Sequence, residues 1–116
     1  MGDTVARRFP RALAGVDPTP IADDRSGRLE FARWLTRPDH PLTARVMVNR
    51  IWRYLFGAGL VRTTDYFGAM GDPPSHPELL DYLAVEFLEH NWSIKSMIRR
   101  IMMSRAYQLG NRPDKA

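Results

Sequence analysis

Apolar residues recur every three to four positions in four segments of the chain, and this spacing predicts four main helices. The first covers residues 27–36, with Ser26 as its N-cap and Pro38 as the residue that closes it. The second covers residues 43–56, and the glycines within 57–59 are expected to stop it in left-handed conformations. Apolar side chains surround most of the second helix, which is typical of a central helix buried on several sides.

The third helix opens with a capping box at residues 75–78 and ends at 90–91. The fourth begins at Ser93 as its N-cap and runs to about Tyr107. Between the second and third helices, residues 57–75 form one long ordered loop, either a functional loop or a packed connection. No segment alternates apolar and polar residues as a strand does, so the sequence predicts an all-α single domain.

The domain layout follows from the positions of the prolines and of the periodic segments. We expect an extended arm or linker at residues 1–24, a helical domain at 25–110 and a tail at 111–116. Within the long loop, the apolar pairs at 60–61 and 66–67 are expected to anchor it to the core. Three apolar residues of the arm are expected to anchor parts of it in the same way: Phe9, Leu13 and Ile21.

Composition excludes several classes of protein. The 116 residues include no cysteine, which excludes a disulfide scaffold, a thiolate zinc site and a cysteine nucleophile within this chain. No apolar run reaches the roughly 18–20 residues of a membrane span. The first residues lack the apolar stretch of a signal peptide.

Charge is arranged in blocks along the chain, whose formal net charge is +4. Residues 25–62 carry eight arginines and two acids, 65–89 carry six acids and no Lys or Arg, and 91–116 carry six bases and one acid. These blocks can neutralise one another within one domain. Net charge is therefore a weak indication of a nucleic-acid partner, and nucleic acid is not the partner that we expect.

A polar stripe on the second helix holds the first candidate site. Arg45, Asn49 and Arg53 recur at four-residue spacing, and Arg50 lies beside them. One interpretation is an interaction or anion-binding site that faces the long loop. The other is structural: Arg45 and Asn49 bond loop carbonyls, while Arg50 or Arg53 pairs with Asp65 or an acid of the third helix. We favour the structural interpretation, because a loop over a buried helix must satisfy its polar groups.

His76 is a second candidate for an interaction site. With Ser75 beside it, and Asp72 and Glu78 nearby, a hydrolytic site can be imagined. However, Ser75 is expected to act as an N-cap, and no third group orients the histidine, so we expect no catalytic residue here. The three histidines lack H-x-x-x-H or H-E-x-x-H spacing, so we expect no metal site and no cofactor.

The fourth helix carries Lys95, Arg99 and Arg100, and a short turn joins it to the third. This arrangement allows a helix-turn-helix interpretation in which these three residues contact DNA. The third helix is acidic and would then lie near phosphates. We therefore expect the two arginines to meet those acids or a partner domain instead.

Seen together, these segments resemble the PSD1 domain, also called DUF1553, over about residues 9–108. The longest matching stretches are SGRLEFARWL at 26–35, PLTARVMVNRIW at 41–52, PPSHPELLD at 73–81 and WSIK at 92–95. Shorter ones are FG at 56–57, GLV at 59–61, Asp65 with FG at 67–68, IM at 101–102 and the run from Ser104 to Tyr107.

The resemblance implies a family that is abundant in planctomycetes and has no assigned activity. Such domains usually lie C-terminal to a DUF1549 domain, often with a cytochrome c-like domain, in large proteins that look exported or periplasmic. Longer relatives continue past the position of Tyr107, so we expect an excised, truncated or stand-alone piece.

The most favoured function is a non-catalytic structural or protein-interaction module of a larger exported bacterial protein. It would dock on a neighbouring domain, DUF1549-like or cytochrome c-like, through its arginine-rich face or the 57–75 loop. One alternative is an accessory element of a composite enzyme site that uses Arg45, Asn49 or His76. The other is a helix-turn-helix-like DNA-binding domain.

Overall fold

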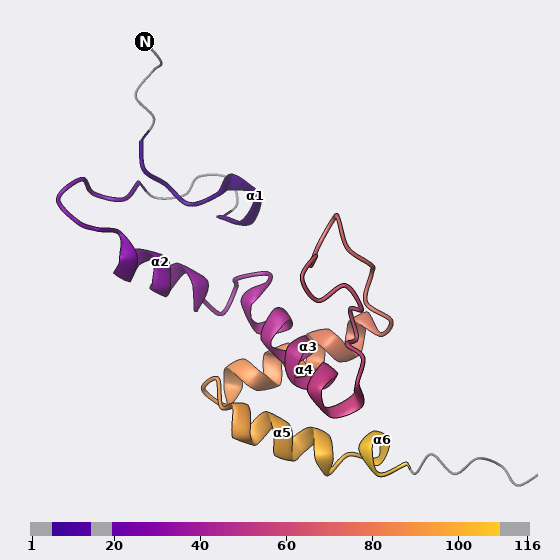
Figure 1. Cartoon of the computed structure of the whole chain (residues 1–116). Coiled ribbons are helices and arrows are strands. Elements are labelled where there is room, and N and C mark those ends of the chain that lie inside the picture. The colour runs from indigo at the N-terminus through magenta and orange to yellow at the C-terminus, as the bar shows by residue number, and fades with distance from the viewer. Residues whose placement is uncertain (1–5, 15–19, 110–116) are drawn as a thin grey trace, which may run out of the picture. The chain divides into compact units, whose positions relative to one another are not determined.

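The computed structural model describes residues 6–14 and 20–109 (Figure 1). Their regular structure is entirely helical, which confirms the all-α prediction. In chain order the helices are α1 (Arg11–Ala14), α2 (Arg28–Leu35), α3 (Thr43–Phe56), α4 (Pro77–Glu89), α5 (Ile94–Met102) and α6 (Arg105–Gln108). The four predicted main helices are α2 to α5.

The chain packs as two compact units, residues 1–43 and 44–116. The boundaries predicted from the sequence, after residues 24 and 110, remain predictions. The C-terminal tail predicted at 111–116 lies outside the described residues.

In the first unit, the described part of the N-terminal arm folds back onto α2. The ring of Phe9 stacks on the buried Trp34 at a centroid distance of 5.0 Å, and Phe31 stacks on the same indole at 5.8 Å. The Arg7 guanidinium donates hydrogen bonds of 2.9 and 2.8 Å to the backbone carbonyls of residues 25 and 26. Aromatic stacking and these bonds to otherwise open carbonyls hold the arm in place.

The start of α2 differs from the prediction. Gly27, not Ser26, occupies the N-cap position, with a left-handed φ of 77°. The Ser26 hydroxyl accepts a long bond of 3.4 Å from the amide of Arg28. A Cβ at Gly27 would lie 3.0 Å from the side chain of Ile21, so both backbone angle and space favour glycine there.

His40 caps the start of α3. Its Nδ1 accepts hydrogen bonds from the amides of Leu42 (3.3 Å) and Thr43 (3.2 Å), and the Thr43 hydroxyl lies 2.8 Å away. Burial lowers the pKa of His40; the negative charge of Asp39 opposes this shift and the positive charge of Arg37 adds to it. A lowered pKa suits the cap, because Nδ1 must stay unprotonated to accept these bonds.

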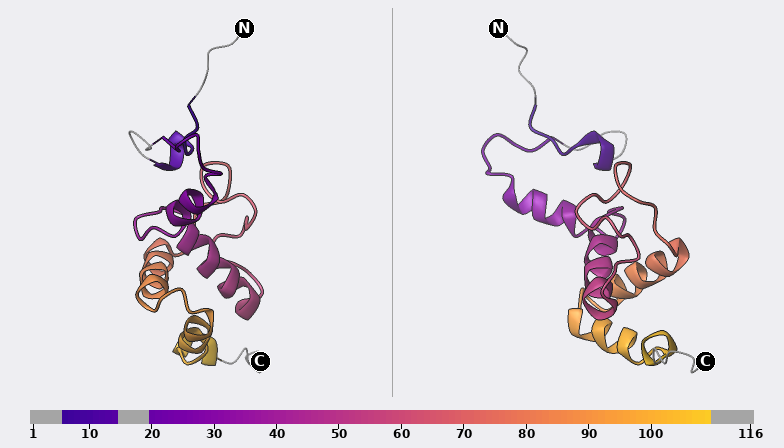
Figure 2. Two further views of the ribbon diagram at one scale, coloured as in Figure 1. Left: turned by 90° about the vertical axis from the view of Figure 1, so that its left-hand side faces the viewer. Right: turned by 45° about the vertical axis from the view of Figure 1, so that its right-hand side comes forward.

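In the second unit, α3, α4 and α5 enclose a core to which the long loop also contributes (Figure 2). Its buried residues are Ala44, Val48, Ile51, Leu60, Val61, Leu80, Leu83, Ala84, Phe87, Met97 and Ile101. Leu60 and Val61 thus anchor the loop as predicted, and Phe67 packs against the core. Tyr66, predicted as a further anchor, is instead 67% exposed.

The turn between α4 and α5 uses two non-glycine residues in left-handed conformation, Asn91 (φ 53°) and Trp92 (φ 58°). The Trp92 amide donates to the carbonyl of Phe87 at 2.9 Å, and the two rings meet edge to face at 5.4 Å. Ser93 then caps α5 as predicted, since its hydroxyl accepts from the amide of Ser96.

The helical path beyond α5 is interrupted, whereas the sequence predicted one helix to about Tyr107. Helix α5 ends at Met102, and α6 begins after Ser104. The Ser104 hydroxyl donates to the carbonyl of Ile101 at 2.6 Å and accepts from the amide of Tyr107 at 3.4 Å. A serine that bonds backbone on both sides competes with the helical ladder, which explains the break.

Candidate functional site

The polar stripe of α3 joins this helix to the rest of the second unit. Arg45 Nε lies 2.6 Å from Asp81 Oδ1 of α4. The Arg53 guanidinium donates a 2.8 Å bond to the hydroxyl of Thr64 in the loop. Asn49, midway between the two arginines, also bonds the loop. All three stripe residues therefore have structural partners, and one partner of Arg45 is the carboxylate of Asp81, which the sequence did not suggest.

Asn49 forms the closest connection between α3 and the loop. Its side chain is fully buried, donates from Nδ2 to the carbonyl of Val61 (3.0 Å) and accepts at Oδ1 from the Val61 amide (2.9 Å). Gly59 makes room for this clamp, because a Cβ there would lie 2.5 Å from the Val61 carbonyl oxygen and 2.8 Å from Asn49 Oδ1. The left-handed role predicted for Gly59 is wrong: only Gly57 of the two has positive φ, at 84°.

The loop is also tied together by its own polar groups. The Thr63 hydroxyl accepts from the amide of Asp72 (2.8 Å) and donates to the carbonyl of Tyr66 (3.1 Å). The Ser75 amide donates to the carbonyl of Leu60 at 2.8 Å and closes the base of the loop. The loop therefore has a defined path between α3 and α4.

A groove of about 800 Å³ opens on the second unit beside this clamp. Helices α3 and α5 and the loop line it with Met47, Arg50, Ile51, Arg53, Tyr54, Leu55, Gly57, Thr64, Asp65, Ile94 and Ile98. Tyr54 is 90% exposed, and Met47 and Ile94 are exposed as well. Its volume lies within the range of about 300–1,000 Å³ that is typical of small-molecule and cofactor sites.

Arg50 is the groove cation whose side chain makes no polar contact with another described residue. It is exposed and, among the described residues, no hydrogen bond or ion pair holds its side chain. Arg53 gives one N–H to Thr64, and neither arginine is within ion-pair distance of Asp65, the partner that the sequence suggested. Two guanidinium groups thus face one carboxylate, and the groove has an excess of positive charge.

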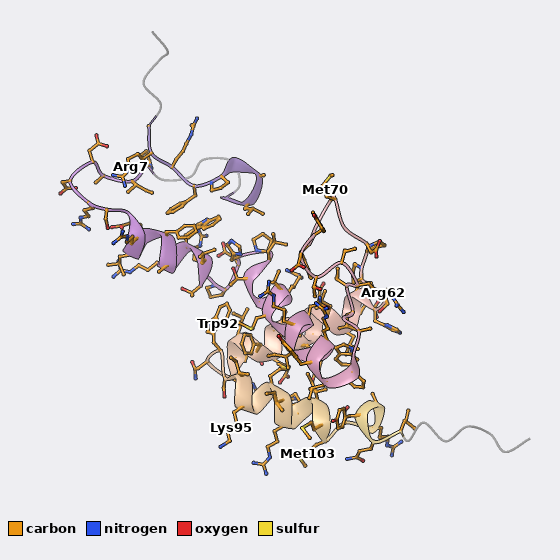
Figure 3. The ribbon with its side chains drawn as sticks, viewed as in Figure 1. Arg7, Arg62, Met70, Trp92, Lys95 and Met103 are labelled. Carbon is orange, nitrogen blue, oxygen red and sulfur yellow. The ribbon has the colours of Figure 1, made fainter. Side chains whose placement is uncertain are left out.

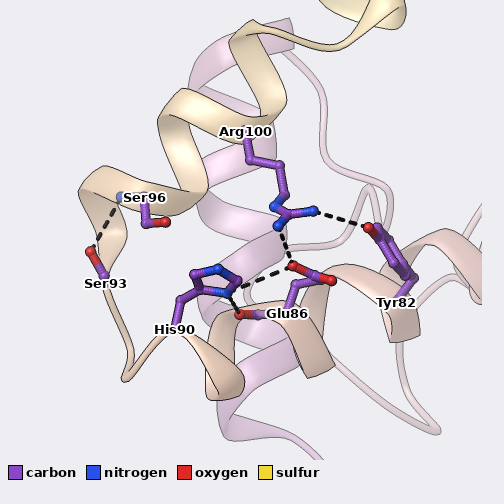
Figure 4. Close-up of polar contacts among 6 residues, drawn as sticks. All are labelled: Tyr82, Glu86, His90, Ser93, Ser96 and Arg100. Carbon is purple, nitrogen blue, oxygen red and sulfur yellow. Dashed lines mark hydrogen bonds and ion pairs between the residues drawn. The ribbon is translucent and has the colours of Figure 1, made fainter.

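The basic residues of α5, like the two arginines of the groove, differ in whether another described residue holds their side chains. Arg100 lies 2.7 Å from Glu86 Oε2 and donates to the Tyr82 hydroxyl at 3.1 Å (Figure 4). His90 bonds the carbonyl of Glu86 through Nδ1 at 2.8 Å. This network connects α4 to α5.

Lys95 and Arg99 have no such role. Both side chains are exposed, and neither forms a hydrogen bond or ion pair with another of the described residues. Figure 3 shows Lys95 pointing away from α5. These two cations form the part of the predicted DNA-contacting set that remains accessible.

Comparison with known protein families finds a match over most of the sequence. Residues 27–116 match the family PSD1, described as a protein of unknown function (DUF1553). The chain belongs to the PSD1 family. This confirms the resemblance noted from the sequence, and the match includes the loop and both helices that line the groove. Searches of curated proteins and of solved structures find no match.

His76 of this PSD1 chain lies at the N-cap of α4, where Ser75 was predicted. The Ser75 hydroxyl is 3.0 Å from His76 Nδ1 and caps no helix amide, so the predicted capping box is wrong. Among residues 6–14 and 20–109, no three His, Asp or Glu side chains gather where they could share a metal ion. None of the helices in these ranges is long and apolar enough to cross a bilayer.

Sequence reasoning missed Tyr54 as a site residue. Met47, Arg50 and Tyr54 follow one another at three- and four-residue spacing, which places them on one face of α3. A face that combines an apolar, a cationic and an aromatic residue differs from the purely apolar core face. This combination of residues on one helix face is the sequence signal from which the site could have been predicted.

Proposed function

We propose that this PSD1 chain is a non-catalytic interaction module that docks onto a neighbouring domain of a larger exported protein through the α3–α5 groove. The observation that carries the proposal is the largely apolar lining of the groove, in which Met47 and Ile94 are exposed and Tyr54 is 90% exposed. Tyrosine and arginine are enriched among residues that dominate binding energy at protein interfaces. Exposed apolar patches of this kind mark interaction sites.

The neighbouring domain follows from the family resemblance: a DUF1549-like or a cytochrome c-like domain. Two observations support docking over a composite enzyme site. Arg45 and Asn49 are both engaged in holding α3 to α4 and to the loop. His76 is exposed and its ring meets the adjacent Ser75, with no orienting carboxylate in hydrogen-bond contact among the described residues.

The test is isothermal titration of the 116-residue chain with a DUF1549-type domain and, separately, with a cytochrome c-type domain from the same source. We expect saturable binding to one of them. Tyr54→Ala is expected to weaken it by about 30-fold, the effect of losing about 2 kcal/mol at a central interface residue. Tyr66→Ala is the matched control, since Tyr66 is an exposed tyrosine that does not line the groove.

Two results would overturn the docking proposal. The first is the absence of saturable binding to either domain type while circular dichroism shows a folded chain. The second is an equal loss of affinity in Tyr54→Ala and Tyr66→Ala, which would place the contact elsewhere on the surface.

The second candidate function is DNA binding by α5, and it is favoured by Lys95 and Arg99, which are exposed and have no partner among the described residues. DNA binding requires affinity that falls steeply as salt rises, because each neutralised phosphate releases counterions. We expect no such dependence for this chain on duplex DNA. A steep salt slope that the double replacement Lys95→Ala with Arg99→Ala abolishes would favour DNA instead.

A further inference from the structure

We infer that the occupant of the groove is an acidic amphipathic helix of the partner, an inference that rests on the docking function proposed above. The first step concerns shape. Helix α3 contributes Met47, Ile51 and Leu55 to the lining, and α5 contributes Ile94 and Ile98. Two helices that present apolar side chains along one open groove form the receptor in helix-in-groove recognition, in which the ligand inserts residues at i, i+3, i+4 and i+7.

Backbone groups point to the same kind of occupant. Recognition of an extended peptide by strand addition needs an exposed sheet edge, and the described residues contain no strand. The groove is lined by side chains of helices and by a loop in which the Thr64 hydroxyl is already hydrogen-bonded to Arg53. A helix satisfies its own backbone hydrogen bonds and therefore needs no hydrogen bonds from the receptor's backbone.

The charge around the groove indicates which charge its occupant should carry. Arg50 and Arg53 face the groove against a single carboxylate, Asp65, and Lys95 and Arg99 add positive charge on the exposed face of α5. The Arg50 guanidinium has no partner among the described residues, and it is suited to bidentate pairing with a carboxylate. Complementary charge gives specificity and faster association, so acidic residues should flank the apolar anchors of the partner helix.

The test uses two synthetic helical peptides of 14 residues that carry leucine at i, i+3, i+4 and i+7. One has glutamate at the flanking positions and the other has lysine at the same positions. Fluorescence anisotropy measures their binding to the full chain. We expect the glutamate peptide to bind about tenfold more tightly at low salt, and this preference to shrink at high salt.

Arg50→Glu is expected to abolish or reverse this preference. The matched control is Arg62→Glu, which changes the net charge equally at an exposed arginine outside the groove (Figure 3). Circular dichroism establishes that both variants fold. Equal binding of the two peptides to the wild-type chain, or an identical effect of the two replacements, would overturn the inference.

The outcomes also separate this inference from the docking function. If a neighbouring domain binds, and Tyr54→Ala weakens that binding while Arg50→Glu does not, docking stands and the acidic helix is wrong. If the peptide preference is found but neither neighbouring domain binds, the groove has the inferred chemistry and the proposed partner domain is wrong.

Discussion

Replacing Asn49 by alanine removes the amide group that joins α3 to the long loop. The two bonds to the Val61 amide and carbonyl disappear together. The helix itself is not weakened, because alanine has the highest helix propensity of all residues. Both Asn49 and Val61 are buried, with exposed fractions of 0% and 2%. Water therefore has no ready access to the backbone groups that lose their partner.

The magnitude follows from those two backbone groups. A buried donor or acceptor left without a partner costs about 1–3 kcal/mol, so the pair costs about 2–6 kcal/mol. Total stability of a domain is only about 5–15 kcal/mol, so the variant loses a large share of it. At about 4 °C per kcal/mol for a chain of this size, the melting temperature should fall by about 10–25 °C.

The assay is thermal and urea unfolding followed by circular dichroism, together with hydrogen exchange of the Val61 amide. Arg50→Ala is the control on the same helix, one residue away, because its side chain has no partner among the described residues. We expect the control to change stability by less than about 0.5 kcal/mol. The Val61 amide should exchange much faster in Asn49→Ala than in the control.

The reasoning is refuted if Asn49→Ala melts within about 3 °C of the wild-type chain, since that corresponds to less than about 1 kcal/mol. It is also refuted if the Val61 amide keeps its protection, because the amide would then have another partner. Either result would mean that the two bonds to Val61 contribute little to holding the loop on α3.

Three further predictions concern other contacts. Gly59→Ala should lower the melting temperature, because its Cβ would lie 2.5 Å from the Val61 carbonyl, and an unchanged melting curve would contradict this. Glu86→Gln should cost only about 1 kcal/mol in urea unfolding, since its pair with Arg100 is partly exposed; a loss above about 3 kcal/mol would contradict that ranking. Burial lowers the pKa of His40, so the unfolded chain binds more protons near pH 6 and stability is lost as pH falls from about 6.5 through the lowered value. His40→Asn, which keeps a capping oxygen but does not titrate, should flatten the melting temperature between pH 7 and pH 5, and an unchanged pH dependence would exclude His40 as its source.

Local signals in the sequence predicted the helices well. The bounds of α3, residues 43–56, agree with the prediction because a proline, a threonine and a glycine mark its ends within a few residues. Errors arose where two local signals competed. Ser26 and Gly27 both suit an N-cap, and the left-handed backbone required there selects glycine.

The groove was harder to predict, because it depends on which apolar positions remain uncovered. The sequence placed Met47 among the residues that make α3 apolar around most of its circumference, yet it is 38% exposed. Whether a side chain of α3 is covered is decided by the path of the loop that follows it and by α5, which lies far away along the chain. For Asn49, the predicted hydrogen bond to a loop carbonyl is present, since a buried polar group must find a partner wherever the loop runs.

The two polar faces of α3 therefore have separable roles, and this separation makes the proposals testable. Arg45 and Asn49 bond α4 and the loop and do not line the groove, so their replacement should act first on stability. Arg53 has both roles, because it bonds Thr64 and also lines the groove. Arg50 and Tyr54 lie on the neighbouring face, contribute to the groove and bury little of their surface, so their replacement should act on binding with little change in stability. Helix propensity alone would favour both alanine variants, and Asn49→Ala more than Arg50→Ala, so it cannot explain a larger loss of stability in Asn49→Ala. A difference between them in unfolding and in titration therefore reports on the two faces and not on the helix.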